Sequence, residues 1–353
     1  MTVQEVLQLN LIEKQFQESK QFFKTHQTKD IKFRKQQLKL LSKSIKGHET
    51  ELLESLKIDL GKGSVEAYAT EIGILLKSIK TARKELKNWA KTKQVDTPLF
   101  MFPTKSYIKP EPYGTVLIIG PFNYPVQLLF EPLIGAIAAG NNAIIKPSEL
   151  TPHVAQVVRK VIEDVFASDF VAVVEGGVEE TQTLINLPFD YIFFTGSENV
   201  GRIVYEAASK NLVPVTLELG GKSPVIVDET ANIKVASDRI SFGKFTNAGQ
   251  TCVAPDYILV NRKVKDELIQ AFKQSIEEFY GKNIQNSPDF GRIVNTKHFN
   301  RLSELLAIHR NEVIFGGHTD DNEQYIEPTI LDGITPQSKI MEEEIFGPLL
   351  PII

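Results

Sequence analysis

The side chain best suited to covalent chemistry in this sequence is Cys252, the single cysteine among 353 residues. It follows Asn247-Ala-Gly-Gln-Thr251, a small and polar turn, whereas an inert cysteine is usually buried among apolar residues. A thiolate is a strong nucleophile, so a cysteine in such surroundings could attack a carbonyl carbon. Because there is no second cysteine, an internal disulfide and a CxxC redox or metal pair are excluded.

Two further polar residues follow predicted buried strands. Glu218 ends the run 215–217, and a carboxylate at such a place is costly unless it has a partner or a task. We interpret it as a general base that takes a proton from water, and we expect it to be partly buried. Asn123 follows the run 115–120, and its side-chain NH₂ could donate to a carbonyl oxygen that becomes negative. Plainer interpretations are a helix cap or ion pair for Glu218 and a turn residue for Asn123.

The segments that must position these side chains alternate between short apolar runs and helical patterns. Strands are predicted at 115–120, 142–146, 170–174, 191–194 and 215–217, with helices at 126–139, 151–166, 178–186 and 198–209. This alternation predicts an α/β fold with a doubly wound, mostly parallel sheet. Ligands of such sheets bind beyond the carboxyl ends of the strands, where the polar residues above are expected to lie.

The length of the chain suggests two domains, at about 100–200 residues each. Amphipathic helices are predicted at 33–60 and 65–89, before an extended, proline-marked arm near 98–112. We predict that residues 1–219 form one domain with these helices, the arm and the parallel sheet. Residues 220–353 are predicted to form a second α/β domain.

Composition excludes several classes of protein. Hydrophobic residues make up 42% and charged residues 24%, as in folded globular proteins, and a net charge of −4 is too small to gather nucleic acid. The six histidines form no HxxxH pair, so we expect no metal site. No signal peptide is evident, and the apolar-rich stretch 126–139 is too short to span a bilayer, so we expect a cytoplasmic protein without a membrane partner.

Nucleotide-binding and hydrolase motifs fail when they are read in full. Gly196-Ser-Glu-Asn-Val-Gly201 has the glycine spacing of a Walker A loop, but Arg202 and Ile203 stand where that loop needs Lys and Ser or Thr. No GxGxxG fingerprint follows the first strand, and there is no GxSxG elbow.

Four segments carry a family resemblance when they are read together and in order. They are Pro121-Phe-Asn-Tyr-Pro125, Glu218-Leu-Gly-Gly-Lys222, Gly249-Gln-Thr-Cys252 and Glu344-Ile-Phe-Gly-Pro348. The sequence resembles the aldehyde dehydrogenase superfamily, most closely its class 3-like branch, over essentially the whole chain. The resemblance implies NAD(P)-dependent oxidation of an aldehyde to a carboxylic acid, by a homodimer whose first domain binds the cofactor and whose second is catalytic.

The resemblance also implies roles for individual residues. Cys252 is the nucleophile, its backbone N–H and Asn123 stabilise the oxyanion, and Glu218 activates the water that releases the acid. Residues 196–201 close the fourth strand and open a helix, whose N-terminal N–H groups favour a diphosphate, and an acidic residue after the second strand can bind ribose hydroxyls. The implied cofactor residues are Lys146, Glu149, Gly196, Ser197, Gly201, Glu344 and Phe346. Glu149 competes with a 2′-phosphate and so favours NAD, with NADP as the alternative.

Two other functions are weighed against this hypothesis. A CoA-acylating dehydrogenase passes the acyl group to CoA and needs no carboxylate at Glu218, and a non-catalytic protein would keep only the fold. Because relatives continue past the Glu344–Pro348 segment, we expect a chain truncated at its carboxyl end, with an incomplete pocket, weak activity and impaired dimerisation. Phe122 and Tyr124 beside Asn123 suggest medium-chain or aromatic aldehydes as substrates.

Overall fold

The computed structural model describes residues 3–353, which form two compact units. The first unit comprises the residues up to Leu52 together with Ala69–Glu218, and the second comprises Leu53–Tyr68 and Leu219–Ile353. Residues 53–68, which we expected with the other amino-terminal helices, therefore pack with the second unit. One contact that holds them there lies at the end of helix α3 (Glu49–Leu60), where the Leu60 carbonyl accepts a hydrogen bond from the Arg292 N–H at 2.8 Å.

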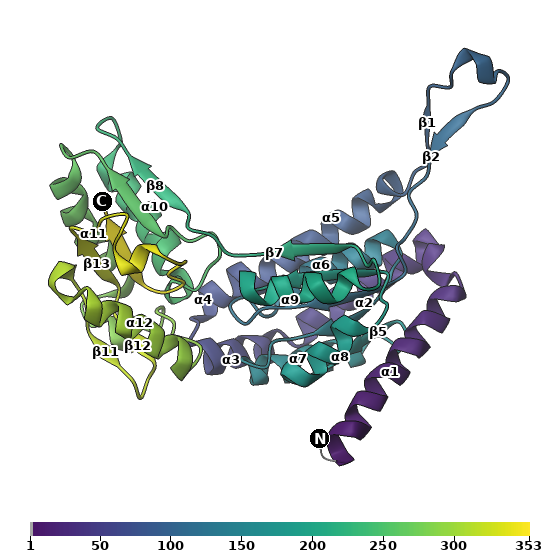
Figure 1. Cartoon of the computed structure of the whole chain (residues 1–353), viewed down its shortest axis with the longest axis horizontal. Helices are drawn as coiled ribbons and strands as arrows, with labels where there is room; N and C mark the ends of the chain where they lie inside the picture. Colours follow the sequence, from purple (N-terminus) through teal and green to yellow (C-terminus); the bar gives the residue numbers. More distant parts are fainter. Residues whose placement is uncertain (1–2) are drawn as a thin grey trace. The chain divides into compact units, whose positions relative to one another are not determined.

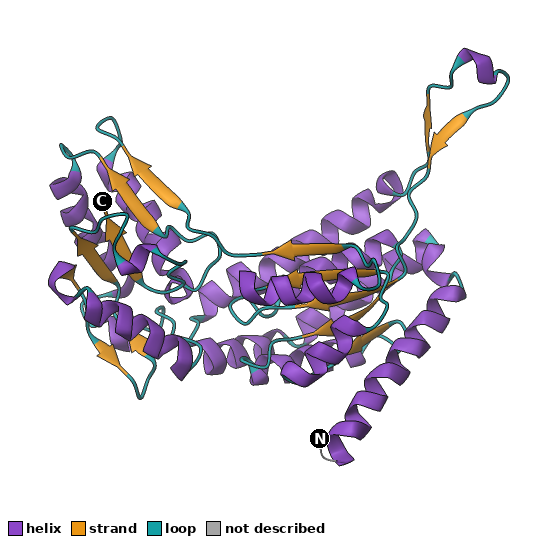
Figure 2. Cartoon of the chain, viewed as in Figure 1, coloured by secondary structure: helices purple, strands orange, loops and turns teal. Residues whose placement is uncertain are grey.

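The first unit is built on a five-stranded parallel sheet, coloured orange in Figure 2. Its strands, in the spatial order β5-β4-β3-β6-β7, are β5 Val171–Val173, β4 Asn142–Lys146, β3 Thr115–Ile119, β6 Tyr191–Thr195 and β7 Val215–Glu218. Every residue of β3 and β4 is buried, as their uninterrupted apolar runs predicted. The predicted parallel α/β fold is confirmed.

Helices connect these strands and cover the sheet (Figure 1). The connecting helices are α6 Gln127–Ala139, α7 Pro152–Glu163, α8 Val178–Asn186 and α9 Glu198–Ser209, and the helices that precede the sheet are α1 Val3–Lys24, α2 Ile31–Gly47 and α5 Gly73–Trp89. Leu38, Leu41 and Ile45 give α2 a buried apolar face, which packs against α5 and α6.

Both predicted amino-terminal helices are interrupted. The segment 33–60 divides at Gly47 and His48 into α2 and α3 Glu49–Leu60, and 65–89 contains α4 Ser64–Ala67, a π-helical turn at Tyr68–Ile72 and α5. The arm is a hairpin of β1 Lys93–Val95 and β2 Ser106–Ile108. Its tip is strongly exposed and apolar, since Leu99 is 92% and Phe100 is 88% exposed.

The second unit has a mixed five-stranded sheet with the spatial order β10-β13-β14-β9-β8. The strands are β8 Pro224–Val227, β9 Tyr257–Val260, β10 Val313–Phe315, β13 Thr329–Asp332 and β14 Leu349–Ile352, with a separate ribbon of β11 Thr319–Asp320 and β12 Tyr325–Ile326. Its long helices are α10 Ile233–Phe245, α11 Lys265–Tyr280 and α12 Thr296–Ile308. Strand β14 is buried and pairs with β13 and β9 on its two sides.

Candidate active site

The carboxyl ends of the first unit's strands meet at one edge of the sheet. The last residues of neighbouring strands are paired there: Ile119 of β3 lies beside Lys146 of β4, and Thr195 of β6 lies beside Glu218 of β7. Six predicted site residues belong to this edge or to the loops that follow it: Asn123, Lys146, Glu149, Gly196, Ser197 and Glu218. A seventh, Gly201, is buried in the first turn of α9. Parallel topology therefore gathers residues that are nearly a hundred positions apart in the sequence.

Lys146 and Glu149 form an ion pair at the end of β4. The Nζ of Lys146 lies 2.6 Å from Oε2 of Glu149, and the lysine side chain is only 3% exposed whereas that of Glu149 is 47% exposed. A buried ammonium is costly unless it is paired, so the carboxylate compensates the charge of the lysine at the sheet edge. Together the two groups offer a donor and an acceptor for hydroxyl groups of a ligand.

Gly196 connects β6 to the start of α9. A side-chain carbon at this glycine would lie 2.6 Å from the ring of Phe194, so only glycine fits without movement. The Gly196 N–H donates to the Glu218 carbonyl at 3.0 Å, and the Ser197 side chain accepts from the Val200 N–H as the cap of α9. The segment therefore brings bare backbone and a helix N-terminus to the sheet edge, an arrangement that suits a diphosphate.

Glu218 is exposed, which corrects the expectation of partial burial. The physical reason is the strand order, because β7 is an edge strand that pairs only with β6 among the described residues. Its carboxylate is therefore solvated and accessible to water.

A braced turn precedes Cys252 in the second unit. Asn247, Ala248 and Gly249 have φ values of 55°, 51° and 76°, so the backbone reverses through the left-handed region. The Gln250 side chain ties this turn to a neighbouring segment, with Nε2 donating to the Arg292 carbonyl at 2.9 Å. Its Oε1 accepts from the Val294 N–H at 3.0 Å. The half-buried Cys252 thus follows a turn whose backbone is fixed by buried hydrogen bonds.

The cysteine turn packs directly against the segment that contains Glu344 and Phe346. A side-chain carbon at Gly249 would lie 2.3 Å from the Gly347 carbonyl oxygen, so the two backbones touch. The second unit therefore contains Cys252, Glu344 and Phe346 on segments that pack against each other at Gly249 and Gly347, and the first unit holds the other seven predicted residues.

The Glu344 carboxylate lies against the turn after β7. A side-chain carbon at Gly220 would lie 1.9 Å from Oε2 of Glu344, and the Gly221 N–H donates a hydrogen bond to this carboxylate. Burial raises the pKa of Glu344 above its ordinary value, and neighbouring Asp256 adds to this. The turn thus depends on Gly220 to let the carboxylate approach, and Gly221 contributes its backbone N–H.

Charged residues that the sequence did not reveal hold this segment in place. Asp256 pairs with Lys222 through one carboxylate oxygen and accepts the Ile345 N–H at 2.8 Å through the other. Arg301 donates to the Ile345 carbonyl at 2.7 Å. Both backbone groups of Ile345, next to Glu344, are therefore satisfied by charged side chains.

Lys244 is a further residue that the sequence analysis missed. It is 1% exposed, and burial lowers its pKa to about 8, against an opposing effect of Asp256 and Glu344. The sequence does contain a signal for Lys244. It follows Ile240 by four residues on α10, so both side chains lie on the same face of the helix, and that face is expected to be apolar.

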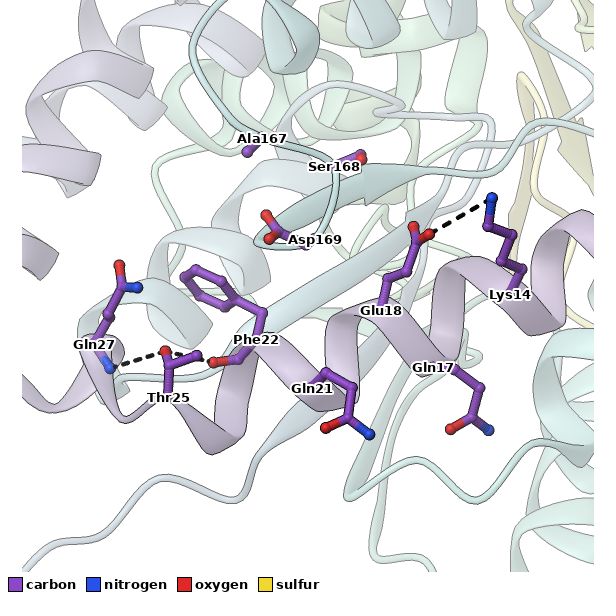
Figure 3. Close-up of a pocket in the computed structure, with 10 residues that line it drawn as sticks. All are labelled: Lys14, Gln17, Glu18, Gln21, Phe22, Thr25, Gln27, Ala167, Ser168 and Asp169. Carbon is purple, nitrogen blue, oxygen red and sulfur yellow. Dashed lines mark hydrogen bonds and ion pairs between the residues drawn. The ribbon is translucent and has the colours of Figure 1, made fainter.

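A shallow hollow on the first unit contains none of the predicted residues. It lies between α1 and the turn Ala167–Asp169 that leads into β5, and Figure 3 shows mainly polar side chains around it, with Lys14 and Glu18 paired at 3.7 Å. The turn precedes β5, so the hollow belongs to the amino ends of the strands rather than to the candidate site.

Comparison with known proteins decides the family. The model of the aldehyde dehydrogenase family matches residues 4–353. The chain belongs to the aldehyde dehydrogenase family. It is 71% identical over 345 residues to 4,4'-diaponeurosporen-aldehyde dehydrogenase of Staphylococcus aureus, a match that covers 98% of this chain and 75% of that protein. The predicted family is therefore confirmed.

Other relatives of this aldehyde dehydrogenase agree with the predicted class 3-like branch and fold. Aldehyde dehydrogenase family 3 member A2 of Macaca fascicularis is 44% identical, over 97% of this chain and 70% of that protein. The substrate-bound structure of Staphylococcus aureus AldH superposes with a TM-score of 0.95 at 71% identity, over 97% of this chain and 75% of that one. Betaine aldehyde dehydrogenase of Staphylococcus aureus, solved in complex with NAD⁺, has a TM-score of 0.85 at 26% identity, over 97% and 70% of the two chains.

Two kinds of feature are absent from the part of this aldehyde dehydrogenase that the structure describes. No helix in that part combines the length and apolar character needed to cross a membrane. Nor does that part contain three His, Cys, Asp or Glu side chains grouped so that they could hold a metal ion.

Proposed function

We propose that this chain oxidises an aldehyde to a carboxylic acid through a thioester on Cys252, with NAD as cofactor and NADP as the alternative. The observation that carries the proposal is the braced turn before Cys252, packed against the Glu344 segment. Such a turn fixes the direction of a nucleophile, which covalent catalysis requires.

In the proposed reaction, the Cys252 sulfur forms a bond to the carbonyl carbon and the carbonyl oxygen becomes negative. The side-chain NH₂ of Asn123 and the Cys252 backbone N–H stabilise that oxygen. Loss of hydride from the same carbon leaves a thioester. Glu218 then takes a proton from water, the hydroxyl adds to the thioester carbon, and the C–S bond breaks to release the acid and the Cys252 thiolate, which is ready to attack again.

The residues at the sheet edge fit a dinucleotide. The N-terminal N–H groups of α9, which follow Gly196, can bind phosphate groups, and the Lys146–Glu149 pair can bind ribose hydroxyls. Glu344 would bind the second ribose, with Phe346 beside the nicotinamide. The cofactor, when bound, supplies the hydride acceptor. Glu149 disfavours a 2′-phosphate and so supports NAD over NADP.

The substrate class that we propose is an apolar aldehyde. Phe122 and Tyr124, both half-buried, flank the buried Asn123. A relative with 71% identity is named for 4,4'-diaponeurosporen-aldehyde, so that compound belongs in a panel with medium-chain and aromatic aldehydes. Assays of the panel with NAD and NADP in parallel would identify the preferred pair, and the mass of the protein in solution would test the expected homodimer.

Replacing Glu218 with glutamine is expected to preserve the first turnover and slow the following ones. Loss of a general base typically costs about 10²–10⁴-fold in rate, and here only release of the acid should be affected. Rapid-mixing absorbance at the NADH band would show a full burst followed by a slow steady state. Glu206→Gln, an exposed carboxylate on α9, is the matched control.

Two outcomes would contradict this part of the proposal. A Glu218→Gln variant with the steady-state rate of the unmodified protein would remove Glu218 from the reaction. NADH formation that depends strictly on added CoA would instead favour the CoA-acylating alternative.

A further inference from the structure

A buried carboxylate from outside the sheet binds the start of the helix that follows Asn123. Glu71 is fully buried, and its Oε2 accepts the backbone N–H groups of Val126 at 2.9 Å and Gln127 at 3.2 Å. These two N–H groups stand at the amino end of α6, where the backbone has no carbonyl partners and a negative charge is favourable.

The N–H groups of Val126, Gln127 and Leu128 at this helix start each have a defined acceptor. Pro125 has no N–H, and the Leu128 N–H donates to the Tyr124 carbonyl at 2.9 Å. Val126 and Gln127 are therefore the donors that need an outside acceptor, and Glu71 serves both.

Glu71 belongs to the π-helical turn Tyr68–Ile72 between α4 and α5. A π turn holds one more residue than an α turn and so shifts the direction of its side chains relative to the flanking helix. Ile72 and Leu75 beside it are buried apolar residues, as expected for the packed face, whereas Glu71 brings a carboxylate into the same interior. The interruption of the helix therefore places the carboxylate of Glu71 in the interior.

The segment that contains Asn123 is fixed at its other end as well. The Gly120 N–H donates to the Lys146 carbonyl at 3.0 Å, and a side-chain carbon at Gly120 would lie 2.9 Å from the Leu129 side chain of α6. Residues 121–126 thus run between the end of β3 and the carboxylate of Glu71, with the buried Asn123 midway.

We propose that Glu71 is a positioning residue, which fixes segment 121–126 so that Asn123 donates its hydrogen bond at the correct place; this inference rests on the proposed function of Asn123. Glu71 does not touch the reacting atoms. It acts by removing the freedom of the backbone three residues after the oxyanion donor. An oxyanion donor is effective only when it is held in advance at the position of the developing charge.

The test compares Glu71→Ala and Glu71→Gln with the unmodified protein. A displacement of about 1 Å at a catalytic group can cost about 10²-fold, so Glu71→Ala should slow the NADH burst by roughly 10- to 100-fold. The KM for the aldehyde should change little, because the lost interaction belongs to the transition state. Glu71→Gln keeps an oxygen that can accept both N–H groups, so it should fold and recover most of the lost rate.

A matched control separates positioning from general loss of stability. Arg34 binds the opposite end of α6, where Nη1 donates to the Ala138 carbonyl at 3.3 Å. Arg34→Met should lower the melting temperature as Glu71→Ala does but leave the burst rate close to that of the unmodified protein. In an Asn123→Ala background, Glu71→Ala should cause little further loss of burst rate, since the group it positions is already absent.

The outcomes distinguish this inference from the proposed function. An inactive unmodified protein, or Asn123→Ala at full burst rate, would overturn the proposed function and this inference with it. An impaired Asn123→Ala together with Glu71→Ala at full rate would overturn this inference alone. The positioning role of Glu71 is also overturned if the losses of the two single variants multiply in the double variant, or if Arg34→Met slows the burst as much as Glu71→Ala.

Discussion

Replacing Cys252 with alanine is expected to abolish aldehyde-dependent NADH formation while leaving NAD binding intact. Removing a covalent nucleophile can lower kcat by about 10⁶-fold, and no other thiol in the chain can replace it. Cofactor affinity should persist, because the pair Lys146–Glu149 and the α9 N-terminus belong to the first unit and Cys252 to the second. Stopped-flow absorbance measures the burst, and titration calorimetry measures the affinity for NAD.

The adjacent residue provides a control for this experiment. Val253 is 77% exposed, so Val253→Ala should change neither the burst nor the affinity for NAD. A Cys252→Ala variant that still shows an aldehyde-dependent burst of one NADH per chain would exclude the thioester route. Loss of NAD binding in Cys252→Ala would show instead that the substitution disturbs more than the reacting sulfur.

Replacing Lys244 with methionine is expected to stabilise the protein at neutral pH. Burial lowers the pKa of Lys244 from 10.5 to about 8, and this difference corresponds to about 3 kcal/mol of unfolding free energy at about 1.4 kcal/mol per pH unit. The unfolded chain binds the proton more tightly than the folded one. The destabilising effect is therefore complete below pH 8 and disappears as the pH rises from about 8 to 10.5. Methionine fills a similar volume without a charge.

Urea unfolding at two pH values tests this prediction. Lys244→Met should be more stable than the unmodified protein at pH near 7. The difference should shrink at pH near 10, because a deprotonated Lys244 no longer carries the cost of a buried charge. Lys297→Met, an exposed lysine on α12, should have almost no effect at either pH. Equal stability of Lys244→Met and the unmodified protein at pH 7 would contradict the argument. A lysine retained at such a cost is typical of a functional site.

The parts of the fold that the sequence predicted are those in which local pattern and burial agree. Strands β3 and β4 are uninterrupted apolar runs, and such runs are typical of parallel strands with helices on both faces. The grouping of Asn123, Lys146 and Glu218 at one edge followed from parallel topology alone. The break at Gly47–His48 was not predicted, because the apolar spacing continues on both sides of it.

The parts that could not be predicted depend on which elements become neighbours. The exposure of Glu218 follows from β7 being an edge strand, and strand order is not contained in the run 215–218 itself. Glu71 resembles the many glutamates of amphipathic helices until the π turn directs it inward. Asp256 and Arg301 meet at Ile345 only after three distant segments have packed together.

The two charged residues at the ends of α6 also make its stability a shared property of three helices. Glu71 comes from the turn before α5 and Arg34 from α2, so opening either end of α6 breaks hydrogen bonds to a different helix. Seven of the thirteen residues of α6 are buried, and the helix contains Pro132, which weakens its own hydrogen-bond ladder. The helices α2, α5 and α6 should therefore open as one cooperative unit, and their amide protons should exchange with solvent at a common rate. The loop that contains Asn123 would then keep its folded conformation for as long as these three helices stay closed.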